Sequence, residues 1–212
     1  MPVNLHWQAI FMNDNIFNPT HQETNLSNKI VAGLERISEA FKVLLWKKAK
    51  LLGLSPIQIQ ILIFINYHKT EFCNVSHLAK EFNVTKPTIS DAIKVLVNKE
   101  LIEKVSSSSD SRSYAIQLSD TGKTAVSETE NFAQPLKNQL SNIYNEDLES
   151  TFNTLSKLIY KLNQIGVLTV QRTCYGCKFY QKNDNQHFCN LLEKELLNSE
   201  IRIDCNEFEE KG

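Results

Sequence analysis

The sequence predicts a mainly helical protein with one small β-hairpin, and three observations support this fold class. Glycine and proline are scarce, with 6 and 5 copies in 212 residues, and a chain poor in these residues favours long helices. Apolar residues recur at helical spacing over most of the length. Residues 101–118 instead form two short apolar runs around a serine-rich centre, as in a hairpin. We therefore expect one compact domain that carries an appendage.

The chain begins with an arm and a long helix. Residues 1–26 start with an apolar stretch and continue as a polar one of low charge. Trp7, Ile10 and Phe11 favour an arm that docks on a partner subunit, whereas chain ends usually fray, so both interpretations stay open. From residue 27 to 54 the periodicity predicts a helix with one apolar stripe, formed by Ile30, Leu34, Ile37, Phe41, Leu44 and Leu45.

A second helix is predicted from Ser55 to about Tyr67. Pro56 suits a first helical turn, where its missing N–H costs little. The segment PIQIQILIFINY is nearly all apolar, so we expect it to form the buried centre of the domain. Its isoleucines are also compatible with a strand, but the flanking caps favour a helix.

A short amphipathic helix follows. Val75, Leu78, Ala79 and Phe82 fall at helical spacing. The helix is predicted to end at Asn83, because asparagine tolerates turn conformations.

The next helix is predicted to begin at Thr85, whose hydroxyl can accept a backbone N–H from the first turn. One face is apolar and consists of Ile89, Ala92, Ile93, Leu96 and Val97. The other carries small polar and cationic side chains that suit phosphate and base-edge contacts. These residues are Pro87, Thr88, Ser90, Asp91, Lys94 and Asn98. An ordinary solvated helix face is the alternative interpretation.

The hairpin that follows favours a DNA-binding role for these two helices over an ordinary solvated face. Its strands contain Leu101, Ile102 and Val105 on one side and Tyr114, Ile116 and Leu118 on the other. Residues 106–111 between them predict a mobile loop. Arg112 at its end can reach a minor groove, where the negative potential attracts arginine, and Asp110 can hold it in place. Two helices, a turn and a hairpin in this order are typical of a winged helix-turn-helix, which places its second helix in the DNA major groove.

The segment from about Leu54 to Gly122 resembles the MarR (multiple-antibiotic-resistance regulator) family of bacterial transcription factors. The motifs that carry the resemblance are LSPIQIQIL, VSHLAKEF, NVTKPTISDAI, LIEK, DSR and LSDTG. The resemblance implies an obligate dimer on a pseudo-palindromic operator and a cleft for a small-molecule effector. It implies major-groove contacts from the second helix and a minor-groove contact from Arg112. Glu100 departs from the family's usual glycine, and Ser111 replaces a common basic residue, which suggests weaker nonspecific binding.

The candidate DNA-contacting residues are Thr85, Lys86, Pro87, Thr88, Ser90, Asp91, Lys94 and Arg112, with Asp110 as support for the wing. The net charge of the segment gives little general attraction to DNA. Residues 75–123 hold seven cations and six anions, an excess of one positive charge, and the whole chain has a formal charge of −1. We therefore expect sequence-reading contacts with a modest salt dependence.

Two further helices are expected after the hairpin. One runs from Gly122 to about Tyr144 with a kink at Pro135. The other starts at Asn145 with an acidic first turn and runs to about Asn163. Their apolar stripes exceed what a monomer needs, so we expect burial across a two-fold axis. Mutual packing within a monomer is the alternative. The expected units are an arm (1–26), a dimerisation helix (27–54), a winged helix-turn-helix DNA-binding domain (55–123), dimerisation helices (124–165) and a cysteine-rich, metal-binding tail (166–212).

The tail holds four of the five cysteines, namely Cys174, Cys177, Cys189 and Cys205. A C-x2-C pair lets two thiolates reach one metal centre from a single turn, and two further cysteines complete four ligands. A disulfide is disfavoured because cytosolic thiols stay reduced. The remaining cysteine, Cys73, is interpreted as apolar filler, with a redox-sensing thiol as the sharper hypothesis.

Zinc and a [4Fe–4S] cluster both remain open, and iron–sulfur is slightly preferred. Zinc ribbons usually have two C-x2-C knuckles, and this tail has one. The spacing, with aromatic residues near the cysteines, resembles small high-potential-type iron–sulfur modules. These aromatics are Phe179, Tyr180, Phe188 and Phe208, and a small core around a structural zinc would use them equally well. His187 could replace one ligand, although an exposed histidine is the expected alternative.

The sequence thus predicts a dimeric, cytoplasmic, DNA-binding transcriptional regulator with a metal- or iron–sulfur-linked tail. No apolar run of 18 residues, phosphate-binding loop or dinucleotide-binding motif is present, so neither a membrane span nor an enzyme is expected. The alternative is a winged-helix interaction scaffold that carries an electron-transfer or structural metal module.

Overall fold

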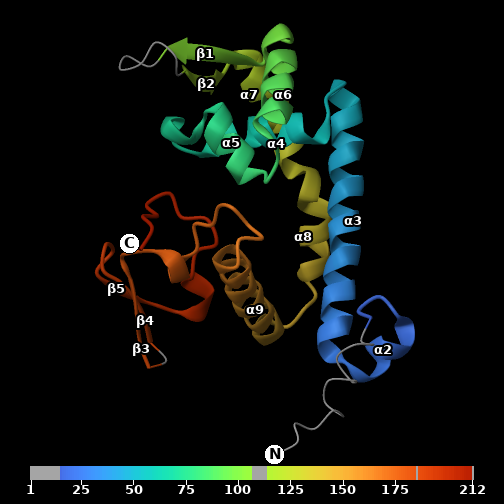
Figure 1. Cartoon of the computed structure of the whole chain (residues 1–212), viewed down its shortest axis with the longest axis vertical. Helices are drawn as coiled ribbons and strands as arrows, with labels where there is room; N and C mark the ends of the chain where they lie inside the picture. The colour runs from blue at the N-terminus through green and yellow to red at the C-terminus, as the bar shows by residue number, and fades with distance from the viewer. Residues whose placement is uncertain (1–14, 107–113, 185, 212) are drawn as a thin grey trace, which may run out of the picture.

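The computed structural model describes residues 15–106, 114–184 and 186–211. A winged-helix core forms one end of the molecule, a long helix extends from it, and the cysteine tail lies beside the core (Figure 1). Among the described residues no single helix is long and apolar enough to cross a membrane, and the one pair of helices that reaches that length together is bent by 89°.

The long helix α3 (Leu26–Leu52) begins and ends where its capping residues stand. The side chain of Asn25 accepts backbone N–H groups at its start, and Gly53 closes it in the left-handed conformation with φ +60°. Part of the predicted arm is helical as well, since α2 (Pro19–Thr24) forms a short turn packed on α3. Residues 1–14, including Trp7, lie outside the described residues.

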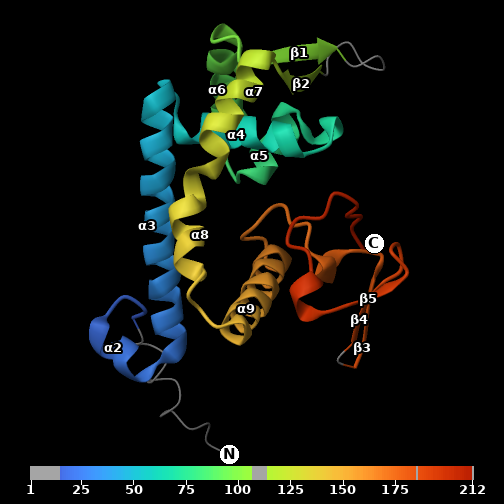
Figure 2. The ribbon, with the colours of Figure 1, turned by 180° about the vertical axis from the view of Figure 1, so that it is seen from behind.

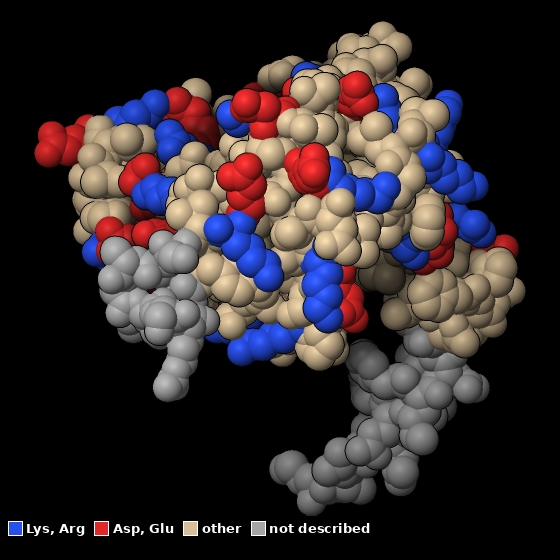
Figure 3. Space-filling view, turned by 90° about the horizontal axis from the view of Figure 1, so that it is seen from above, with Lys and Arg blue, Asp and Glu red and all other residues tan. Residues whose placement is uncertain are grey.

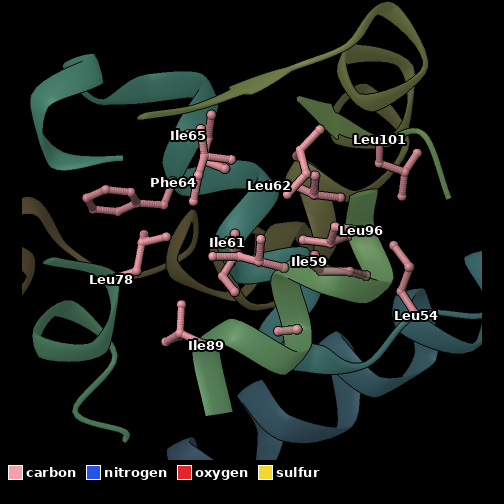
Figure 4. Close-up of a cluster of buried hydrophobic side chains, with 14 of the residues drawn as sticks. Leu54, Ile59, Ile61, Leu62, Phe64, Ile65, Leu78, Ile89, Leu96 and Leu101 are labelled. Carbon is pink, nitrogen blue, oxygen red and sulfur yellow. The ribbon is translucent and has the colours of Figure 1, made fainter. Parts of the chain in front are cut away.

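Helix α4 (Pro56–Tyr67) is the centre of the core, as the sequence predicted. It packs against α3, α6, α7 and β2, so it is covered on several sides. Ile59, Ile61 and Leu62 have no exposed surface, and they meet Leu78, Ile89 and Leu96 from the two following helices (Figure 4). Each such side chain contributes about 1.5–3 kcal/mol by leaving water.

The predicted helix-turn-helix and wing are confirmed. Helix α5 (Val75–Glu81) follows the turn η1 (Thr70–Phe72), and α6 (Lys86–Asn98) follows α5. Strands β1 (Ile102–Ser106) and β2 (Tyr114–Leu118) pair antiparallel. Helix α7 (Asp120–Thr129) follows β2, packs on α4 and places Gly122 against the chain at Leu101, where a Cβ would lie 1.9 Å from the carbonyl oxygen of Leu101. Only glycine fits this approach.

The helical region after the wing is more broken than predicted. Instead of one kinked helix to Tyr144, α7 passes into the 3-10 turn η2 (Glu130–Ala133), and α8 (Gln134–Leu140) begins with a proline in its first turn. Helix α9 (Asn145–Gln164) agrees with the prediction. It contacts the tail through η3 and η4 (Figure 2).

The tail folds around a small antiparallel sheet that the sequence analysis did not predict. Its strands β3 (Tyr180–Asn183), β4 (Gln186–Cys189) and β5 (Lys194–Leu196) lie in that order. The 3-10 turns η3 (Cys174–Gly176) and η4 (Asn198–Glu200) flank it. Its own apolar core contains Tyr180, Leu196 and Ile201, separate from the winged-helix core.

Candidate DNA-binding surface and cysteine cavity

The start of α6 is held in place by its cap and presents a polar face. The Thr85 hydroxyl accepts the backbone N–H of Thr88 at 3.3 Å and lies 2.8 Å from the Thr88 hydroxyl. Ile89 and Ile93 anchor the opposite face in the core. The predicted contact residues that remain exposed are Thr85, Lys86, Pro87, Thr88, Asp91 and Lys94, and Ser90 is half-buried at the margin. The helix therefore offers a rigid, polar surface at its first two turns.

The charge on this face is mixed, as the residue count predicted. Lys94 Nζ lies 3.0 Å from the carboxylate of Asp91, so one cation of the face is already paired. Lysine and arginine alternate with acidic residues over the end of the molecule that carries α6 and the wing, without a continuous basic patch (Figure 3). Contacts here would depend on hydrogen bonding more than on bulk charge.

The two strands of the wing are paired in one register, and the tip at residues 107–113 lies outside the described residues. Ile102 pairs with Leu118 at the base and Ser106 with Tyr114 at the far end. Lys104 Nζ lies 4.6 Å from the centre of the Tyr114 ring and stiffens the hairpin. Arg112 and Asp110, predicted to contact the minor groove, lie outside the described residues.

All four tail cysteines line one cavity. Cys174 and Cys177 come from η3 and its end, Cys189 from the end of β4, and Cys205 from the turn after η4. The cavity has a volume of about 30 Å³, and Phe179, Tyr180, Leu191, Leu192 and Leu196 are among its other lining residues. The fold thus gathers residues that are up to 31 positions apart in sequence.

The sulfur atoms in this cavity are partly desolvated and receive hydrogen bonds. The backbone N–H of Arg202 donates to Cys174 Sγ at 3.2 Å, and Nη1 of Arg202 lies 3.5 Å from Cys205 Sγ. Burial is the main cause of a raised pKa at the Cys174 thiol, which the Arg202 hydrogen bond opposes. Among the described residues, no three His, Cys, Asp or Glu side chains come close enough together to hold a single metal ion.

His187 is neither exposed nor free to act as a ligand, which corrects the expectation for this residue. Its Nδ1 lies 2.5 Å from the Tyr180 hydroxyl and its Nε2 lies 3.0 Å from Asn198 Oδ1, so both ring nitrogens are engaged inside the tail. Tyr180 lines the cavity as expected from its position near the cysteines. Phe188 is not among the lining residues, and Phe208 packs against the tail core.

The junction that fixes the tail to the winged helix has no local signal in the sequence. Arg172 is 7% exposed as a residue, and its guanidinium donates to both carboxylate oxygens of Glu81 at the end of α5, at 2.8 and 3.0 Å. It also donates to Asp204 at 2.5 Å. Burial lowers the pKa of Arg172, but the hydrogen bonds to both acids outweigh it, so the pKa is raised overall and the charge is permanent.

The turn of the helix-turn-helix is part of the same junction. Asn83, with φ +55°, donates its side-chain N–H to the carbonyl of Val167 at 3.2 Å. The hydroxyl of Thr169 donates to Asn83 Oδ1. Asp204 reaches His68, at the end of α4, at 2.9 Å. The tail therefore contacts the winged helix at the end of α4, at the end of α5 and at the turn between α5 and α6.

Cys73 lies apart from the cavity and has the character of apolar filler. It is 1% exposed and packs in the winged-helix core. Burial raises the pKa of its thiol to about 11, so the reactive thiolate form is suppressed at neutral pH.

The winged helix of this chain is similar to known proteins of one family. Residues 52–113 match the family model described as MarR family. No curated protein is similar enough to count as a match.

Similar solved structures cover a little under two thirds of the chain. The MepR–DNA complex of S. aureus is 23% identical, with a TM-score of 0.55, over 62% of this chain and 97% of that one. A MarR transcriptional regulator from Methanosarcina mazei Go1 is 20% identical, with a TM-score of 0.56, over 64% and 97%. S. aureus MepR in its DNA-binding conformation is 22% identical, with a TM-score of 0.56, over 63% and 98%. The chain therefore has a MarR-type fold over nearly two thirds of its length, and more than a third lies beyond these alignments.

Proposed function

We propose that the protein is a dimeric, cytoplasmic, sequence-specific DNA-binding transcriptional regulator that acts without catalysis. The observation that supports this most directly is the exposed polar face of α6, whose start is fixed by the Thr85 cap and whose other face is buried. A rigid helix of this kind can enter a major groove and read base edges. The MepR–DNA complex of S. aureus has a similar fold.

Dimerisation is supported by apolar surface that this chain leaves uncovered. On the predicted stripe of α3, Ile30, Ile37 and Phe41 are exposed by 47%, 45% and 40%. Leu140 and Ile143, at and after the end of α8, are also exposed. Burying these side chains against a second copy would remove them from water and space two α6 helices for one pseudo-palindromic operator.

The tail supplies the sensing part of the proposal. Its four cysteines would bind zinc or a [4Fe–4S] cluster, and its contacts with α5 would report the state of that centre to the DNA-reading helices. A small-molecule effector would fit the cleft between the tail and α5. This cleft has a volume of about 280 Å³ and is lined by Phe72, His77, Lys80, Val170, Arg172 and Phe208 among others.

Gel-shift titration with the DNA upstream of the chain's own gene tests the proposal. Lys86→Ala and Ser90→Ala should each weaken specific binding by roughly tenfold or more, because a lost base-edge contact costs about 1–3 kcal/mol. Lys157→Ala removes the same charge as Lys86→Ala from an exposed position on α9 and should leave binding unchanged. Equal binding by all three variants would exclude α6 as the reading helix.

A second candidate function is an interaction scaffold that carries an electron-transfer or structural metal module. The mixed charge around α6 favours it, since it gives little general attraction to DNA (Figure 3). The same titration separates the two candidates. A scaffold would give no specific shift, whether or not the cysteine cavity is filled.

A further inference from the structure

The cysteine cavity has more room than one metal ion needs. A tetrahedral zinc site with Zn–S bonds of about 2.3 Å draws its four sulfurs to within about 3.8 Å of one another. In this tail the donors line the same cavity, yet no three of them within the described residues gather closely enough for one ion. Four cysteines that share one cavity, without three of them converging on a single point, leave room for a group larger than one ion.

The space between the cysteines is consistent with such a group. Its volume of about 30 Å³ exceeds the roughly 10–15 Å³ that a single water needs. Phe179, Leu191 and Leu192 help to line the cavity and limit access of solvent. Glu200, Arg202 and Glu207 also line it, but the four thiols and the apolar side chains predominate. Soft thiolate ligands suit a group that is itself soft and carries its own sulfur.

Hydrogen bonding to two of the sulfurs suits ligating thiolates. Arg202 provides a backbone N–H to Cys174 Sγ and a guanidinium group near Cys205 Sγ. Donors of this kind stabilise negative charge on ligating thiolates and set the potential of iron–sulfur clusters. Arg202 would also offset part of the negative charge of four thiolates around one centre.

We propose that Cys174, Cys177, Cys189 and Cys205 hold one [4Fe–4S] cluster per chain, with one thiolate on each iron. Because the ligands then bind four different metal atoms, their sulfurs need not converge on one point. The inference deepens the sensing part of the proposed function, but it does not depend on whether the protein binds DNA.

Anaerobic reconstitution of the full-length protein with an iron salt, sulfide and a thiol reductant tests the assignment. The expected result is four irons and four acid-labile sulfides per chain with broad visible absorption. Cys189→Ser and Cys205→Ser, at the two half-exposed ligands, should each lose most of the iron and sulfide. Cys73→Ala is the matched control, because Cys73 lies in the other core, and it should keep the full complement.

Two measurements keep the result interpretable. Circular dichroism of each variant before reconstitution shows whether the helical core is folded, and a parallel sample receives zinc alone. One zinc per chain, with no iron and sulfide retained after reconstitution, would overturn the proposal. Retention of neither metal by the folded wild-type protein would overturn it as well. A gel shift on the same samples measures DNA binding separately. A failure to bind the operator can therefore be told apart from a failure to bind the cluster.

Discussion

Arg172 and Glu81 lie 91 positions apart in sequence and form a two-pronged ion pair between the tail and the end of α5. The same guanidinium binds Asp204, and the backbone N–H of the adjacent Cys205 donates to the carbonyl of Arg172 at 3.2 Å. A cavity cysteine is therefore connected to the helix-turn-helix through one arginine. A rearrangement of the cysteine loop would change the position of Arg172 and the restraint that it places on α5.

Arg172→Ala should detach the tail from α5. Removing one partner of a buried pair leaves the other charge uncompensated and costs about 3–5 kcal/mol. We expect a matching fall in the free energy of unfolding and faster hydrogen exchange of the α5 amides. The Lys69–Glu207 pair provides the control, since it also joins core and tail, at 3.2 Å, but both side chains are about half exposed. Lys69→Ala should cost at most about 1 kcal/mol. Equal effects of the two changes would contradict the junction.

The local parts of this fold could be predicted from the sequence because their signals are local. The cap at Thr85, the apolar stripe of α6 and the alternation in the wing each depend on residues a few positions apart. The C-x2-C pair likewise identified the cysteine set that lines the cavity.

The missed features depend on long-range contacts. Nothing near Arg172 in sequence indicates Glu81 as its partner, and the tail strands are too short for a clear period-2 pattern. His187 is expected to be exposed, yet the fold turns it toward Tyr180 and Asn198. Such contacts form only when segments far apart in the sequence pack together, and the residue types alone do not indicate which segments will meet.

Glu100→Gly should stabilise the winged helix. Glu100 has φ +57° between α6 and β1, a left-handed conformation that costs a residue with a Cβ about 1–2 kcal/mol. The added flexibility of glycine in the unfolded chain offsets part of this gain, so we expect a net rise of about 0.5–1 kcal/mol in the free energy of unfolding. Urea denaturation checks it, with Glu103→Gly in β1 as a control that should destabilise. A loss of stability in Glu100→Gly would mean that the Glu100 side chain makes a compensating contact.

Ile37→Glu should break the proposed dimer. A carboxylate in the centre of the α3 stripe would be buried without a partner in the two-fold interface. We expect a monomer in sedimentation analysis and loss of specific operator binding. Val43 lies on the opposite side of α3 and is 66% exposed, so Val43→Glu should leave the mass and the affinity unchanged. A wild-type protein that sediments as a monomer would exclude the dimer.

The stability of the junction should fall in mild acid because of His77. This ring stacks on Phe72 at 4.7 Å, and its Nε2 has no hydrogen-bond partner among the residues described. Burial lowers the pKa of His77 below its ordinary value near 6.5, against the opposing effect of Glu81.

Because the pKa of His77 is lower in the folded protein than in the unfolded chain, His77 binds a proton less readily in the folded state. The contribution of neutral His77 to the free energy of unfolding is present above about pH 6.5 and is lost as the pH falls. His77→Phe keeps the stacking and removes the titration, so it should flatten the slope of unfolding free energy between about pH 8 and about pH 5. That slope is limited to about 1.4 kcal/mol per pH unit for one proton. A variant with the wild-type slope would assign the acid sensitivity to other groups.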